Sequence, residues 1–177
     1  ISITDAINSL GSSSPISLTL SNLSLTNGYI YEFKIRYIND FGIGLFSSVA
    51  SGMSYKVASA PVITSAVAGN AQIVVSWSAP SSLGGGTLSK YEVKLDGAVS
   101  ATVNAGSPTT ATISSLTNGT SYDISIQAFT DVTGTQYGGA IASQDDLIPF
   151  TVPDVPSNLQ AFATNGGASL SWDEPSN

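Results

Sequence analysis

The side chains available for chemistry in this chain are limited by two missing residue types. Its 177 residues include no histidine and no cysteine, which excludes histidine-based catalysis, disulfide bonds and thiolate or imidazole metal sites. Carboxylates remain, in the adjacent pairs Asp145-Asp146 and Asp173-Glu174. A glycosidase needs two carboxylates that flank one bond, whereas adjacent residues of an extended chain point to opposite sides. We therefore predict that the protein is not an enzyme and has no cofactor.

Two further patterns are candidate ligand sites. Asp145, Asp146 and Asp154 could supply oxygen ligands to a calcium ion between two domains, but solvated charges on a linker are the interpretation we favour, and EF-hand spacing is absent. The run Gly84-Gly85-Gly86 lacks the Lys-Ser/Thr that completes a phosphate-binding loop. We interpret it as a flexible loop between two strands. No metal site is predicted.

Two sequons for N-glycosylation are present, Asn22-Leu23-Ser24 and Asn118-Gly119-Thr120. A chain this rich in Asn, Ser and Thr produces such matches by chance. Asn22 stays a candidate, whereas Asn118 already has a role in a predicted turn.

The composition indicates a neutral surface rich in hydroxyl and amide groups. Charged residues make up only 10% of the chain, against about 25% in typical soluble domains. The net charge is −7, from 5 basic and 12 acidic residues, which argues against binding to nucleic acid or to an anionic membrane surface. No apolar stretch is long enough to span a membrane. Such a surface is common on extracellular proteins, so we expect an extracellular, cell-surface or virion-surface location.

The sequence Leu-Thr-Asn-Gly occurs twice, at 25–28 and 116–119 (116 − 25 = 91), and an alternating run follows each copy. In the second copy Tyr122, Ile124 and Ile126 alternate with polar residues. A period of two is the signature of a half-buried strand. Asn-Gly tolerates positive φ and suits a tight connection. Each copy therefore predicts a turn that leads into a long strand.

Short alternating runs at 71–77, 90–95 and 110–116 are separated by turn residues, a spacing typical of an all-β sandwich. Trp77 and Trp172 lie in similar segments, VVSWSAPSS and SLSWDEPSN (172 − 77 = 95). The two markers together indicate a repeat of about 90–95 residues, which suits a sandwich domain.

The order of these motifs resembles the fibronectin type III family. The residues that match the family pattern are Trp77, Pro80, Tyr91, Val93, Leu116, Gly119 and Tyr122, and in the first copy Leu25, Gly28 and Tyr31. The resemblance implies tandem immunoglobulin-like β-sandwich modules. It also implies that the tyrosine hydroxyl bonds back to upstream backbone while the ring fills the core. We therefore predict a structural core that includes Trp77, Tyr91, Tyr122, Tyr31, Leu116, Leu25 and Trp172.

Aligning the copies predicts one complete module and two partial ones. Residues 1–59 form the C-terminal part of a module, 60–152 a whole module and 153–177 the N-terminal part of a further one. We favour the interpretation that the chain is a piece of a longer array. In the alternative, the front of one copy completes the back of another by strand complementation, although the equivalent of Tyr91 would then be missing.

The predicted function is that of a non-catalytic spacer or adhesion array. Its expected partners are neighbouring modules or subunits of the same assembly, and a cell-surface glycan or protein remains open. Alternatives are accessory linker modules of a secreted carbohydrate-active enzyme and a ligand-binding adhesin or receptor segment. For the latter, the candidate contact residues lie on glycine-bearing loops: Phe41, Phe46 and Tyr137.

Overall fold

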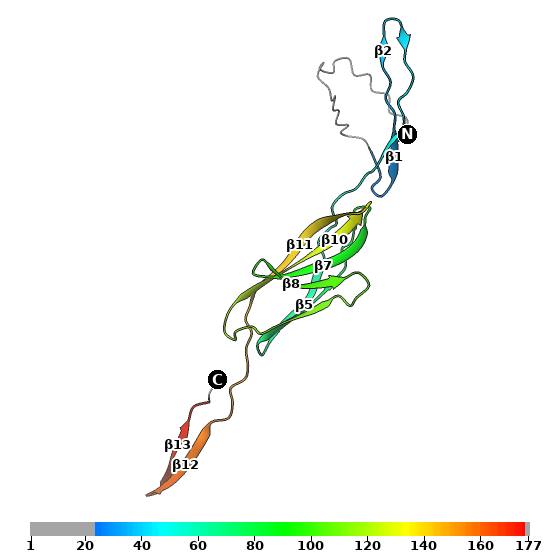
Figure 1. Ribbon diagram of the computed structural model, residues 1–177. Coiled ribbons are helices and arrows are strands. Elements are labelled where there is room, and N and C mark those ends of the chain that lie inside the picture. Colours follow the sequence, from blue (N-terminus) through cyan, green and yellow to red (C-terminus); the bar gives the residue numbers. More distant parts are fainter. Residues whose placement is uncertain (1–23, 176–177) are drawn as a thin grey trace.

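The computed structural model describes residues 24–175, and within that range the chain forms strands and no helix. It therefore has no helix there that could cross a membrane. The strands follow one another along an elongated molecule (Figure 1). In chain order they are β1 (Ile30–Phe33), β2 (Ile38–Asn39), β3 (Gly42–Ile43), β4 (Ala50–Met53), β5 (Val62–Gly69), β6 (Gln72–Ser78), β7 (Thr87–Leu95), β8 (Ala98–Asn104), β9 (Thr110–Ser114), β10 (Tyr122–Val132), β11 (Thr135–Leu147), β12 (Ser157–Thr164) and β13 (Gly167–Asp173).

The seven strands β5 to β11 form a β-sandwich, which confirms the predicted fold class. One sheet has the order β5-β6-β9 and the other β11-β10-β7-β8, and all pairs are antiparallel. Alternating sequences form these strands because every second side chain can then enter the space between the sheets.

The core of the sandwich consists of the inward-facing residues of four strands. Trp77 and Tyr91 are each only 2% exposed, and their rings meet edge to face with centroids 5.4 Å apart. Partly buried residues such as Leu116 and Tyr122 pack against this core. The buried members are Ile73, Val75, Trp77, Tyr91, Val93, Ala111, Ile113, Ile124, Ile126 and Ala128.

A tyrosine corner occurs in both copies of the repeat. The Tyr122 hydroxyl accepts a hydrogen bond from the Thr117 amide at 3.1 Å, and the Tyr31 hydroxyl accepts one from the Thr26 amide at 2.8 Å. In each case the glycine of the turn has positive φ, 85° at Gly28 and 82° at Gly119. The same hydrogen bond, between a tyrosine hydroxyl and the amide five residues upstream, therefore occurs in both copies.

The strands outside the sandwich form two-stranded sheets: β1 with β4, β2 with β3, and β12 with β13. No second sheet covers them among the described residues, so side chains that a complete sandwich would bury remain accessible. Trp172, predicted as a core residue, is instead 56% exposed. Leu25 and Tyr31 are half-buried for the same reason. The favoured interpretation, a longer array, and the alternative, strand complementation between copies, would each cover these faces.

The two tryptophans provide a matched test of the core. Trp77→Ala should lower the free energy of unfolding of the sandwich by about 3–5 kcal/mol, because it leaves a cavity in a packed core. Trp172→Ala should change it by less than about 0.5 kcal/mol, since that side chain is largely exposed. Denaturant unfolding followed by circular dichroism measures both, and equal losses would contradict the assignment of the core to β5–β11.

The Tyr91 hydroxyl offers a second test because it is buried without a hydrogen-bond partner among the described residues. Burial raises the pKa of Tyr91 above its ordinary value of 10.0. The neutral form is therefore favoured in the folded state, and stability should fall as pH rises above about 10. Tyr91→Phe should leave stability at neutral pH unchanged or raise it, since no hydrogen bond is lost. It should also reduce the alkaline loss, and thermal unfolding at pH 7 and 11 measures both effects.

Candidate functional site

The acidic residues considered for catalysis or calcium are spread along the surface. Asp146 accepts a hydrogen bond from the Ser121 hydroxyl at 3.1 Å, and its amide donates to the Asp123 carboxylate at 3.1 Å. The Asp173 carboxylate accepts from the Asn158 amide group within the β12–β13 hairpin. Over residues 24–175, no three acidic side chains gather as a metal ion would require. These carboxylates thus serve turns and strand pairing. The candidate glycosylation site Asn22 lies outside the described residues.

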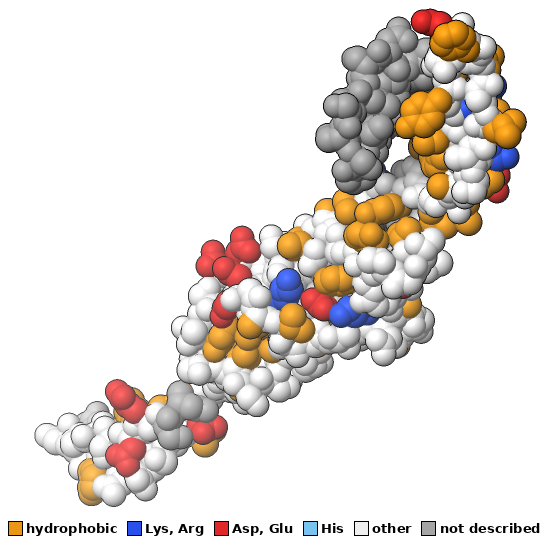
Figure 2. Space-filling model, turned by 45° about the horizontal axis from the view of Figure 1, so that its top comes forward, with side chains coloured by type: hydrophobic (Ala, Val, Ile, Leu, Met, Phe, Trp, Pro, Cys, Tyr) orange, Lys and Arg blue, Asp and Glu red, His pale blue; other side chains and the backbone are white. Residues whose placement is uncertain are grey.

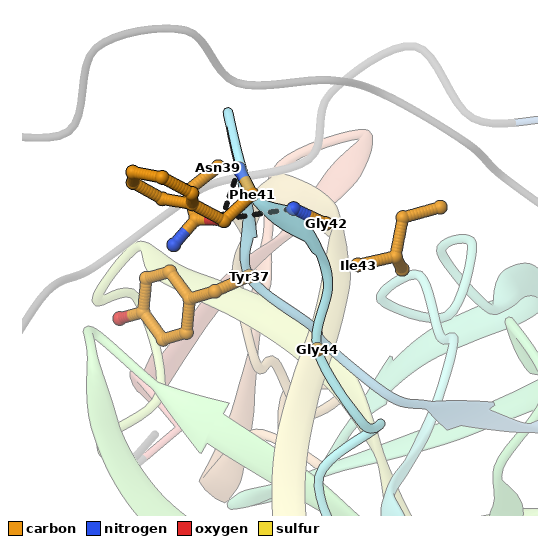
Figure 3. Close-up of a pocket in the computed structure, with 6 residues that line it drawn as sticks. All are labelled: Tyr37, Asn39, Phe41, Gly42, Ile43 and Gly44. Carbon is orange, nitrogen blue, oxygen red and sulfur yellow. Dashed lines mark hydrogen bonds between the residues drawn. The ribbon is translucent and has the colours of Figure 1, made fainter.

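The first candidate contact loop is the β2–β3 hairpin, which borders a hollow of about 320 Å³ (Figure 3). The Asn39 side-chain oxygen accepts from the amides of Phe41 and Gly42 at 3.0 and 3.1 Å and so closes the turn. Phe41, at the tip, is 98% exposed. Phe46 lies beyond the hairpin, with the Arg36 guanidinium 4.7 Å above the centre of its ring. This loop is open to solvent.

Tyr137 is placed differently from the other two candidates. Its ring packs on that of Tyr55, with centroids 4.5 Å apart and planes inclined by 38°. Hydrogen bonding between the two side chains, with smaller contributions from burial and charge repulsion, raises the pKa of Tyr55. Because Tyr55 follows β4 and Tyr137 lies in β11, the pair joins the N-terminal strands to the sandwich. Tyr137 therefore already has a partner within the chain.

The linker that enters the sandwich, residues 54–59, is hydrogen-bonded to the sandwich from Lys56 onward. The Lys56 amide donates to the Gly84 carbonyl at 2.9 Å and the Ser59 amide to the Ser82 carbonyl at 2.9 Å. Between them, the carbonyl of the buried Ala58 accepts from the Ala140 amide at 2.9 Å. The linker thus lies between the loop that connects β6 to β7 and the start of β11.

The first Asn-Gly turn also reaches the sandwich. The Gly28 amide donates to the Ser54 carbonyl at 2.8 Å, which ties the turn to the start of the linker. A Cβ atom added to Gly85 would lie 2.3 Å from the Gly28 nitrogen, and one added to Gly28 would lie 3.2 Å from the Gly85 Cα. The two backbones are therefore packed directly on each other, which only glycine allows at this distance.

The role of Gly84-Gly85-Gly86 differs from the flexible loop expected from the sequence. Each glycine lies against backbone of another segment: Gly84 against the Lys56 carbonyl, Gly85 against Gly28 and Gly86 against the Asp131 carbonyl. Gly84 and Gly85 also have positive φ, 67° and 96°. The run is a packed surface that receives the preceding turn and linker. Sequence alone did not indicate this, because the contacting segments are far apart in the chain.

We call this arrangement the joint, defined by the turn 27–28, the linker 54–59, the loop 81–86 and β11 residues 137–140. Its contacts are backbone hydrogen bonds, glycine packing and one aromatic pair. The one salt bridge among residues 24–175, Lys90 with Glu92 at 2.7 Å, lies within β7. Hydrophobic side chains gather over the N-terminal strands and where these meet the sandwich (Figure 2). The arrangement joins the N-terminal strands to the sandwich.

Two glycines of the sandwich provide a matched test of the joint. Gly85→Ala adds a Cβ atom 2.3 Å from the Gly28 nitrogen, whereas Gly97→Ala adds one with no atom within 4 Å, although both have positive φ. Spin labels on Asp40→Cys and Ser107→Cys, in a chain without native cysteine, report the distance across the joint. Gly85→Ala should broaden the distance distribution and Gly97→Ala should leave it narrow. Equal broadening would show that the glycine contact does not hold the joint.

Comparisons with known proteins found one family model and a set of similar solved structures. The family model described as fibronectin type III domain matches residues 59–144. The central fibronectin-III array of RIM-binding protein is 22% identical with a TM-score of 0.39; the alignment covers 70% of this chain and 47% of that one, so this chain spans about half of that array. Domains d3–d4 of the rat CD45 extracellular region are 14% identical with a TM-score of 0.44. That alignment covers 82% of this chain and 78% of the CD45 chain.

A search among curated proteins gave no match. The family match covers nearly all of the strands from β5 to β11, whose order and tyrosine corner are described above. Residues 59–144, and with them the sandwich, are a fibronectin type III domain, and the tyrosine corner of that domain is repeated in the N-terminal strands.

Proposed function

We propose that this chain is a non-catalytic spacer in which fibronectin type III modules are held end to end at a fixed separation. Modules of this family are generally structural, adhesion or linker units without catalysis. The observation that carries the proposal is the joint, in which the Gly28 and Gly85 backbones touch and the linker is hydrogen-bonded to the sandwich. A linker bound in this way transmits position from one module to the next.

The physical basis of the spacer is the short path between modules. From Tyr55 to Pro61 the chain has no free segment, because Lys56, Ala58 and Ser59 bond to the sandwich. Pro61, which is buried and precedes β5, has a fixed φ that further limits bending. Inter-domain motion is the default where an interface is small, so these directed bonds are what would restrain it.

Extracellular, cell-surface or virion-surface placement belongs to the same proposal. Domains of this family are common in extracellular proteins. The net charge of −7 makes copies of this chain repel one another weakly. With only 5 basic residues, the chain is a poor partner for nucleic acid. The proposed partners are neighbouring modules or subunits of the same assembly.

A second candidate function is adhesion through the β2–β3 hairpin. Phe41 at its tip is exposed beside the hollow formed with Tyr37 and Ile43 (Figure 3). An exposed aromatic ring beside a hollow suits contact with a protein or a sugar ring. Binding of the chain to cell-surface glycans or proteins that disappears in Phe41→Ser, with the fold intact, would favour this candidate over the spacer.

The spacer proposal predicts that the maximum dimension of the full chain does not depend on salt concentration. Because the joint contains no ion pair among the described residues, screening should not loosen it. Small-angle X-ray scattering of the full chain should give the same maximum dimension from about 0.05 to about 1 M salt. A maximum dimension that changes steadily with salt would contradict a fixed spacer.

A further inference from the structure

The joint uses two different ends of a type III module. The preceding module contributes the donor end, which consists of the Asn-Gly turn and the residues after its last strand. The following module contributes the acceptor end, which consists of the glycine-rich loop 84–86 and Tyr137. The central sandwich therefore uses its acceptor end in the joint, and its own donor end is at the opposite pole.

The donor end of the sandwich repeats two hydrogen bonds of the N-terminal strands, the one made by the turn glycine and the one made by the corner tyrosine. Gly119 donates to the Pro149 carbonyl at 2.9 Å as Gly28 does to the Ser54 carbonyl at 2.8 Å. These bonds align Ser54 with Pro149, and hence Tyr55 with Phe150 and Lys56 with Thr151. The same spacing aligns Pro61 with Pro156 (156 − 61 = 95). Every element that the preceding module brings to the joint thus has a counterpart.

This second donor end is open over the described residues. A Cβ atom added to Gly119 would meet nothing within 4 Å, whereas one added to Gly28 would meet Gly85. Phe150 is 60% exposed, and its amide donates to the Gly69 carbonyl at 3.1 Å, so its backbone is fixed. A turn whose glycine touches nothing leaves room for the backbone of another chain segment.

The turn is also held in place before any partner arrives. The Asn118 side-chain oxygen accepts from the Ala71 amide at 2.8 Å, and its nitrogen donates to the Asn70 side-chain oxygen at 2.9 Å. The Tyr122 hydroxyl fixes the other side of the turn at the Thr117 amide, at 3.1 Å. A surface fixed in advance loses little conformational entropy on binding.

We propose that the turn Asn118-Gly119 together with Phe150 and Thr151 is a docking surface for a further fibronectin type III module, specifically one whose β6–β7 loop carries glycine at the Gly85 position. The Thr151 amide would donate to the carbonyl at the Gly84 position, and Phe150 would pack on an aromatic ring at the Tyr137 position. A side chain at the Gly85 position would meet the backbone of Gly119, so the surface selects its partner by the absence of a side chain.

This inference rests on the proposed spacer function and adds the identity of the next partner. It is tested in a duplicated chain in which residues 1–155 are followed directly by residues 61–177, which keeps the linker in register because Val155 aligns with Ala60. Amide hydrogen exchange by NMR then reports on Thr151 of the first copy, which faces the second copy. Its exchange should be on the order of tenfold or more slower than in the single chain.

Two substitutions in the second copy complete the test. Gly85→Ala there should restore fast exchange at Thr151, whereas Gly97→Ala should not, since its added Cβ meets no atom within 4 Å. Fast exchange at Thr151 in the duplicated chain, with Lys56 still protected, would overturn the docking surface and leave the spacer proposal standing. Fast exchange at both residues would overturn both.

Discussion

The contact between the backbones of Gly28 and Gly85 is the constraint on which the linkage of modules depends. A Cβ atom on Gly85 would lie 2.3 Å from the Gly28 nitrogen, so any other residue there would push the preceding turn away. Because the turn is tied to Ser54, that displacement would also move the linker. The hydrogen bond from Lys56 to Gly84 and the Tyr55–Tyr137 ring contact lie in the same joint.

The tyrosine corner connects this joint to the fold of each module. In both copies the tyrosine hydroxyl holds the backbone five residues upstream, and the glycine with positive φ closes the turn. In the sandwich the corner places the ring of Tyr122 against the core. In the first copy it places the backbone of Gly28 against Gly85.

The sandwich could be predicted from the sequence, because alternation, turn residues and the repeat all act over short distances. Trp77, Tyr91 and the alternating residues of β6, β7, β9 and β10 were placed on the core face in this way. The joint could not be predicted, since Gly28 and Gly85 are distant in sequence and glycine gives no periodic signal. Tyr137 was a candidate for contact with a partner, and its packing on Tyr55 could not be predicted for the same reason. Trp172 was expected in a core, but the opposing sheet is not among the described residues.

The most direct measurement of the central claim is a nuclear Overhauser effect between the amide proton of Gly28 and the α protons of Gly85 in the full chain. Backbone packing at the distances given by the structure predicts a strong cross-peak between these two residues, which are far apart in sequence. A spectrum that contains the expected contacts within the sandwich, such as Trp77 with Tyr91, but no contact between Gly28 and Gly85 would contradict the account.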